Sequence, residues 1–163
     1  MALAGVNLEV VAVEHVGSTA VPGLVAKPVI DCDIVVSSDD VARASDVLVG
    51  LGFRPLGELG IRQRWAFQEP QRLAGTNTYV IVDGSLSLRN HLRFRDTLRA
   101  DPGLRDRYSA VKQRVGATAS TIEEYGRGKN AVIQEILAAA GLTEDERRSI
   151  DSAQVPSREE VPR

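Results

Sequence analysis

The chain is poor in the residues that build disulfides, zinc cages and histidine metal centres. Its 163 residues include one cysteine, Cys32, and two histidines, His15 and His91. A single cysteine excludes an internal disulfide and a cysteine-based zinc cage. Two histidines are too few for a three-histidine metal site.

Long apolar runs and strong net charge are also absent. No run approaches the roughly 18 residues of a membrane-spanning helix, and the N-terminus lacks a basic segment and soon reaches Glu9 and Glu14, unlike a signal peptide. We therefore expect a cytoplasmic protein with no membrane partner. The net charge of -2 gives no overall attraction to nucleic acid, which is not expected as a partner. The length and a hydrophobic content of 43% suit one soluble domain.

Strand patterns dominate the first half of the chain and helical patterns the second. We predict strands over residues 8–15, 29–36, 53–56, 62–68 and 76–82. We predict helices over residues 39–51, 87–100, 104–115 and 120–140. This order predicts an α/β (α+β) fold, with a mixed sheet of four or five strands backed by helices and a C-terminal helical segment. The domain is assigned to residues 1–142, and residues 143–163 form a charged tail expected to add little to the core.

Asp31 and Asp33 interrupt an apolar predicted strand. Residues two apart in a strand project from the same face, about 6.5 Å apart, so the two carboxylates should point together while Cys32 points into the core. Two carboxylates about 6 Å apart repel by roughly 3 kcal/mol at an effective dielectric of about 20, which a cation would relieve. Mg²⁺ takes one or two carboxylates plus substrate phosphates. The alternative is a wet sheet end, where both carboxylates pair with Lys27 or an arginine.

Gly17, Ser18 and Thr19 directly follow the first predicted strand. Glycine lets the backbone turn tightly and approach a ligand closely. A helical turn beginning there would offer hydroxyls and free N–H groups to a phosphate. An ordinary strand-to-helix cap has the same pattern, so this segment alone does not decide the matter.

Together the two segments resemble a known arrangement. A strand ending in Gly-Ser, a short helix and a strand bearing Asp-x-Asp is the pattern of DNA polymerase beta-like nucleotidyltransferases. The string EHVGSTAVPGLVAKPVIDCDIVV is similar to the signature of the GrpB family within that fold, and the resemblance covers about residues 9–140. It implies that Gly17 and Ser18 hold a triphosphate, and that Asp31 and Asp33 hold Mg²⁺ as the catalytic pair.

The chain departs from the family pattern in two places. Active nucleotidyltransferases usually supply a third carboxylate from a later strand, but the matching predicted strand carries Asn77 and Tyr79 instead. Glu69 and Asp83 are candidate substitutes at strand ends. Without a third oxygen ligand, a two-metal mechanism lacks part of its ligand set. Relatives also often begin with a helix before the first strand, so one flank of this sheet could be exposed.

Several basic residues lie where they could cover apolar surface or reach a ligand. Lys112 and Lys129 each follow a tyrosine by four residues, and Arg95 lies among leucines. A long stem that covers apolar surface while its charge reaches water is favoured for Arg95 and Lys112. For Lys129 a phosphate contact is equally favoured. Lys27 is either an ion-pair partner of the two aspartates or a phosphate contact. The basic excess over residues 89–114 is better explained as a solvated helical face than as a phosphate site.

Other nucleotide-binding motifs are missing. No G-x-x-x-x-G-K-[ST] occurs, which excludes a P-loop kinase, including the dephospho-CoA kinase to which GrpB domains are sometimes fused. No G-x-G-x-x-G follows a strand. Two hypotheses remain. One is Mg²⁺-dependent transfer of a nucleotidyl group from a nucleoside triphosphate to an unknown acceptor. The other is a non-catalytic module of the same fold that binds a nucleotide, a coenzyme A-related molecule or a protein.

Overall fold

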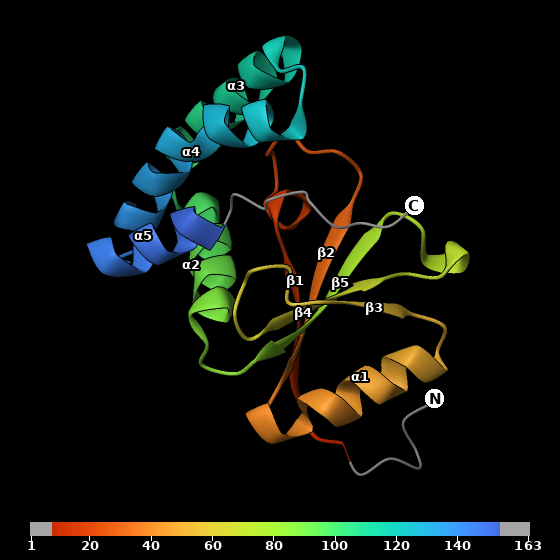
Figure 1. The fold of residues 1–163 in the computed structure, drawn as a ribbon. Coiled ribbons are helices and arrows are strands. Elements are labelled where there is room, and N and C mark those ends of the chain that lie inside the picture. Colours follow the sequence, from red (N-terminus) through yellow and green to blue (C-terminus); the bar gives the residue numbers. More distant parts are fainter. Residues whose placement is uncertain (1–7, 154–163) are drawn as a thin grey trace.

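Alternating apolar residues in the first half of the chain form the strands of one five-stranded sheet (Figure 1). The computed structural model describes residues 8–153. The strands are β1 Val10–Val16, β2 Ile30–Val36, β3 Arg54–Gly57, β4 Arg64–Gln68 and β5 Thr76–Val82. The helices are α1 Val41–Gly50, α2 Leu86–Ala100, α3 Pro102–Thr118, α4 Ile122–Ala139 and α5 Glu144–Ala153. The predicted α/β fold with a mixed sheet is confirmed.

The strand order brings the candidate phosphate loop and the two aspartates to one end of the sheet. The order is β1-β2-β5-β4-β3, in which β2 and β5 run parallel and the other pairs run antiparallel. The start of β2 therefore lies between the end of β1 and the start of β5. In this register Asp31 stands between Val16 on one side and Asn77 on the other.

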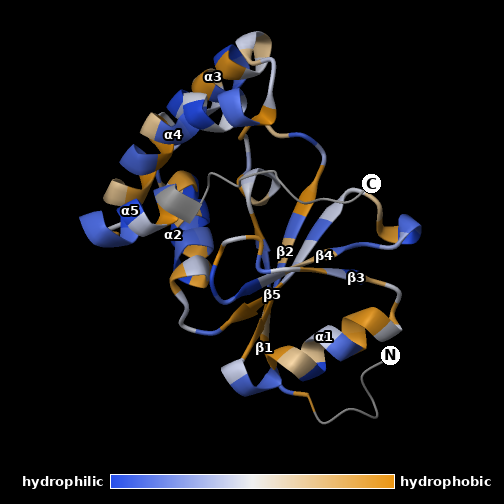
Figure 2. Cartoon of the chain, in the orientation of Figure 1, coloured by the Kyte–Doolittle hydropathy of each residue, from blue (hydrophilic) through white to orange (hydrophobic). Residues whose placement is uncertain are grey.

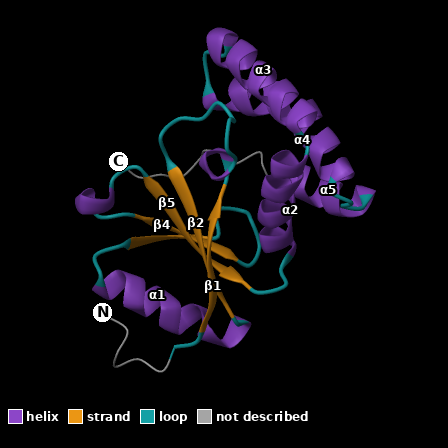
Figure 3. Cartoon of the chain, turned by 180° about the vertical axis from the view of Figure 1, so that it is seen from behind, coloured by secondary structure: helices purple, strands orange, loops and turns teal. Residues whose placement is uncertain are grey.

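The two faces of the sheet are covered by different helices (Figure 3). Successive side chains of a strand point to opposite faces. Val36 and Val80 pack with Leu48 of α1 on one face, whereas Val35 and Ile81 pack with Leu88 of α2 on the other. Figure 2 shows apolar residues along the strands and many polar residues on α3, α4 and α5. None of the described helices is long and apolar enough to cross a lipid bilayer.

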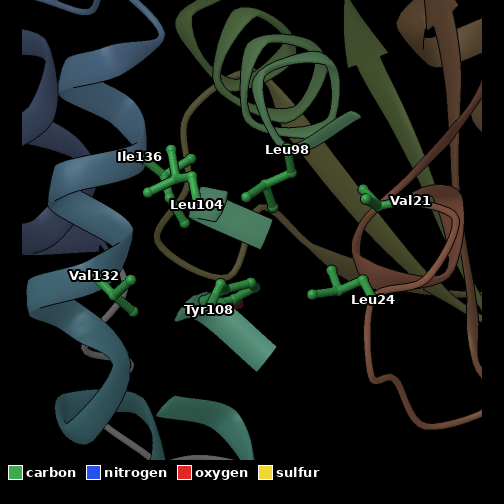
Figure 4. Close-up of a cluster of buried hydrophobic side chains, with 7 residues drawn as sticks. All are labelled: Val21, Leu24, Leu98, Leu104, Tyr108, Val132 and Ile136. Carbon is green, nitrogen blue, oxygen red and sulfur yellow. The ribbon is translucent and has the colours of Figure 1, made fainter. Parts of the chain in front are cut away.

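A second core joins the helical half to the loop after β1. Its buried members are Val21, Leu24, Leu98, Leu104, Tyr108, Val132 and Ile136. Figure 4 shows Leu98 of α2 between the loop residues Val21 and Leu24 on one side and the side chains of α3 and α4 on the other. Burial of this cluster fixes the loop against α3 and α4, and both line the site described below.

Local capping sets the boundaries of the helices. The predicted helix over residues 104–115 begins two residues earlier than expected, because Pro102 is the first residue of α3. Proline suits this position because its missing N–H would have no helical partner, and the Asp101 carboxylate accepts a hydrogen bond from the Leu104 N–H at 2.9 Å. At the start of α4 the Glu124 N–H donates to Thr121 Oγ1 at 3.1 Å, and the Glu124 carboxylate accepts from the Ser120 N–H at 2.7 Å.

The segment after residue 142 differs from the expectation. It was predicted to add little to the core, yet α5 buries Ile150 against Leu137 and Leu142. One apolar residue on a charged helix suffices here because the end of α4 supplies the rest of the contact. Residues 154–163 of the predicted tail lie outside the described residues.

One flank of the sheet is open among the described residues. Val11 and Val13 of β1 are 54% and 65% exposed, and Ile30 of β2 is 48% exposed. Cys32 lies on this face with Ile34, opposite to the face of Asp31 and Asp33, as predicted. It is only half-buried, however, and so does not reach the core. Burial, followed by the charge of Asp33, raises the pKa of the Cys32 thiol.

Candidate functional site

A cleft of about 690 Å³ opens between the sheet end and helices α3 and α4. Its volume falls within the range of about 300–1,000 Å³ that is usual for ligand pockets. Five of the seven predicted site residues line it, namely Ser18, Thr19, Lys27, Asp31 and Lys129. Gly17 and Asp33 complete the predicted set and lie next to the cleft rather than in its wall.

Gly17 allows the loop after β1 to approach Asp31 closely. Its φ is +72°, and a Cβ atom there would lie 2.2 Å from Asp31 Oδ2. The second oxygen, Asp31 Oδ1, accepts a hydrogen bond from Asn77 Nδ2 at 2.8 Å. Asn77 thus lies beside Asp31 on the neighbouring strand, which is the strand where an active nucleotidyltransferase would usually carry its third carboxylate.

Gly17→Ala should be more damaging than the same change at a glycine with open surroundings. Gly84 also has a positive φ, +70°, and a Cβ atom added there would meet no other atom within 4 Å, so Gly84→Ala is the control without a collision. A positive-φ backbone costs a non-glycine residue about 1–3 kcal/mol, and at Gly17 the collision with Asp31 should add about 1–3 kcal/mol. Urea unfolding of the two variants tests this. Equal losses of unfolding free energy would contradict the proposed role of Gly17 in the close approach.

Asp33 is buried and paired with a histidine. Its side chain has no solvent exposure, and Asp33 Oδ2 lies 2.7 Å from His91 Nδ1 of α2. Tyr79 packs edge-on against His91, and Arg64 lies 4.5 Å above the Tyr79 ring. Asp33 Oδ1 has no hydrogen-bond partner among the described residues. A buried carboxylate oxygen without a partner is costly, which is a reason to consider a ligand for it.

Sequence reasoning missed the pairing of His91 with Asp33. The available signal was helical periodicity, since His91 follows the sheet-facing Leu88 by three residues and therefore lies on the same side of α2. A histidine on that stripe needs a polar partner from the sheet. Which strand residue would meet it depends on how α2 crosses the sheet.

No third carboxylate joins the aspartates within residues 8–153. Asp83 follows β5 at the end opposite to Asn77, and Glu69 follows β4 without lining the cleft. Among the described residues, no group of three or more His, Cys, Asp or Glu side chains is placed to hold a metal ion. The side chains do suit one Mg²⁺ that shares its coordination with phosphate oxygens, because Asp31 lines the cleft and the unpartnered Asp33 Oδ1 belongs to the same face of β2.

Lys112 fastens the loop after β1 to α3. Its Nζ donates to Ser18 Oγ at 2.8 Å and to the Val25 carbonyl at 2.6 Å. The sequence favoured a Lys112 stem that covers apolar surface while its charge reaches water. That interpretation is wrong, because the charged amine of Lys112 lies in the cleft wall.

The cleft holds more positive than negative charge. Lys27, Lys112 and Lys129 line it with a single carboxylate, that of Asp31. Burial, followed by the charge of Lys129, lowers the pKa of Lys112 to about 8, and Asp31 partly offsets both effects. Burial and then the charge of Lys27 lower the pKa of Lys129, whose Nζ lies 4.0 Å above the Tyr125 ring. A bound anion would relieve this crowding of like charges.

The arginines of α2 and α3 mostly hold other parts of the chain. Arg95 pairs with Glu14 at 2.6 Å and donates to the His15 carbonyl at 3.0 Å. Arg99 donates to the Ala20 carbonyl at 2.8 Å. Neither arginine lines the cleft, so these two members of the basic excess over residues 89–114 bind α2 to β1 and to the loop after it.

Comparison with known proteins identifies relatives over most of the chain. Residues 2–139 match the family model described as GrpB protein. The UPF0157 protein YqkA of Bacillus subtilis is 34% identical over 128 residues, which cover 77% of this chain and 37% of that protein. The UPF0157 protein BH1888 of Halalkalibacterium halodurans is 37% identical over 135 residues, which cover 80% of this chain and 68% of that protein. The chain thus spans little more than a third of YqkA.

A solved structure agrees with this relationship. The crystal structure of the conserved protein GrpB from Enterococcus faecalis aligns with a TM-score of 0.68 and 30% identity, covering 80% of each chain. Terminal uridylyl transferase 4 from Trypanosoma brucei with bound UTP also aligns, with 22% identity and a TM-score of 0.39. That score is too low to support any statement about the chemistry of this chain.

Proposed function

Because this chain belongs to the GrpB family, we propose that its cleft binds the phosphates of a nucleotide. One observation carries the proposal, namely the three lysines that line the cleft against a single aspartate. Their surplus of two positive charges suits a ligand with two negative charges, such as a nucleoside triphosphate with one Mg²⁺. Half-buried amines attract such a ligand more strongly than exposed ones because water screens them less.

Each side chain has a distinct task in this proposal. Lys112 holds Ser18 in place and offers positive charge from α3, while Lys27 and Lys129 approach from the loop and from α4. Gly17 keeps the loop close to Asp31. Mg²⁺, when bound, would be held by Asp31 and Asp33 and would neutralise phosphate charge.

Nucleotidyl transfer is the second candidate function. Its support is the placement of Asp31 and Asp33 on one face of β2 with Asp33 Oδ1 unpartnered. In such a reaction an acceptor hydroxyl attacks the α-phosphate and pyrophosphate leaves, and positioning and charge neutralisation supply most of the catalysis. The lack of a third carboxylate beside this pair, within the part of the chain that the structure describes, favours binding over transfer.

A thermal-shift panel tests the binding proposal. Nucleoside triphosphates, coenzyme A and inorganic triphosphate are added with and without Mg²⁺ to the parent protein and to Asp31→Asn. A ligand at about 100 times its dissociation constant stabilises the folded state by roughly 2.7 kcal/mol. We expect a Mg²⁺-dependent shift with a nucleotide that is lost in Asp31→Asn. The control Asp145→Asn, whose side chain is 92% exposed on α5, should behave like the parent.

Three outcomes would change the proposal. The absence of a shift with every nucleotide would remove it. A shift with coenzyme A alone would redirect it to that ligand class. Pyrophosphate release with a nucleoside triphosphate and Mg²⁺, abolished in Asp31→Asn, would promote transfer from second candidate to the function of the cleft.

A further inference from the structure

Every lysine of this chain lines the same cleft. Lysine and arginine together number 20, and lysine occurs only at positions 27, 112 and 129. All three residues belong to the wall of the cleft. Every other basic side chain among the 20 is an arginine, including the arginines of α2, α3 and α5 that form ion pairs with carboxylates.

Phosphate binding alone does not account for this separation of residue types. Arginine binds phosphate at least as well as lysine, because its planar guanidinium offers two parallel hydrogen bonds. What arginine cannot do is lose its proton near neutral pH and act as a nucleophile. A lysine amine can do both when it is partly buried or next to another cation.

Lys112 is the lysine best placed for this chemistry. Its Nζ is fixed in the cleft wall by Ser18 Oγ at 2.8 Å and by the Val25 carbonyl at 2.6 Å. The Tyr108 ring lies 5.4 Å from the amine. Burial, followed by the charge of Lys129, disfavours the charged form of the amine, and Asp31 opposes both effects. With its pKa lowered to about 8, a substantial fraction of Lys112 is a free amine in mildly alkaline solution.

We propose that Lys112 forms an imine with a phosphorylated aldehyde or ketone, whose phosphate is held by Lys27 and Lys129. This inference shares one premise with the proposed function, namely that Lys27 and Lys129 bind phosphate. The amine nitrogen bonds to the carbonyl carbon, and the carbonyl oxygen leaves as water with the two hydrogens of the free amine. No oxidant or reductant takes part. The second polar group of such a ligand, its phosphate, explains why two further lysines stand beside the nucleophile.

The test is imine trapping with pyridoxal 5′-phosphate as the probe. The protein is incubated with the probe and reduced with borohydride, and the adduct is located by peptide mass spectrometry. Since the chain contains only three lysines, each adduct maps to one position. We expect the adduct on Lys112, with at least a tenfold loss in Lys112→Arg, which keeps the charge but cannot form an imine. The control Arg107→Met, on the same helix but 61% exposed and outside the cleft wall, should stay within about threefold of the parent.

The outcomes separate this inference from the proposed function. Pyridoxal, which lacks the phosphate, should label Lys112 at least tenfold less than pyridoxal 5′-phosphate at equal concentration. Labelling spread evenly over the three lysines, or confined to the terminal amine, would overturn the inference even in the parent protein. If nucleotides still shift the melting temperature in that case, the proposed function stands. If Lys112 is labelled and no nucleotide binds, the imine chemistry stands and the nucleotide proposal fails.

Discussion

Leu98→Ala lowers the free energy of unfolding by roughly 2–5 kcal/mol, the range for removing a fully buried leucine side chain. Leu98 has no solvent exposure and touches the loop after β1 as well as α3 and α4. Its loss leaves a cavity between the two walls of the cleft. We therefore expect two losses in this variant. Urea unfolding should give a lower free energy of unfolding, and the protein that remains folded should show a smaller thermal shift with nucleotide.

A surface truncation of similar chemistry provides the control. Val13 is 65% exposed on β1 and lies away from the cleft. Val13→Ala should stay within about 0.5 kcal/mol of the parent, as is usual for surface changes. Similar losses in the two variants would mean that the core between the loop and the helices contributes little to the fold.

Lys112→Met weakens binding of a nucleoside triphosphate by about tenfold to a hundredfold. Methionine keeps most of the apolar stem but removes the charge and the hydrogen bond to Ser18 Oγ. Hydrogen bonds to charged groups contribute about 1.5–3 kcal/mol, which corresponds to this range. Isothermal titration with ATP and Mg²⁺ measures the change. Arg107→Met, on the same helix but 61% exposed and paired with Glu135, should leave the affinity within about twofold.

The affinity should also depend on pH through the same side chain. The protonated amine attracts the phosphates, so binding in the parent falls as the pH rises through about 8, the pKa of Lys112. Bound phosphate shifts this transition upward because it stabilises the charged amine. The other groups that face this amine are Lys129 and Asp31, and both remain in Lys112→Met. A fall of equal size in Lys112→Met would assign the pH dependence to Lys129 instead.

Local sequence patterns determined most of the secondary structure. The predicted strand over residues 76–82 matches β5 to the residue. The placement of Asp31 and Asp33 on one strand face also follows from the alternation of a strand. These features depend on neighbours within a few residues, so the sequence alone carries them.

Tertiary packing alone decided which side chains meet in the site. Asn77 binds Asp31 across 46 residues of sequence, His91 binds Asp33 across 58, and Lys112 binds Ser18 across 94. Strand order, sheet register and the angle at which α2 and α3 cross the sheet select these partners. No local periodicity encodes those quantities, because they arise from how whole faces of helices and strands bury their apolar area. The sequence by itself therefore determined the family, the elements and the chemistry of single residues, while the fold determined that Asp33 is buried with His91 and that three lysines share one cleft.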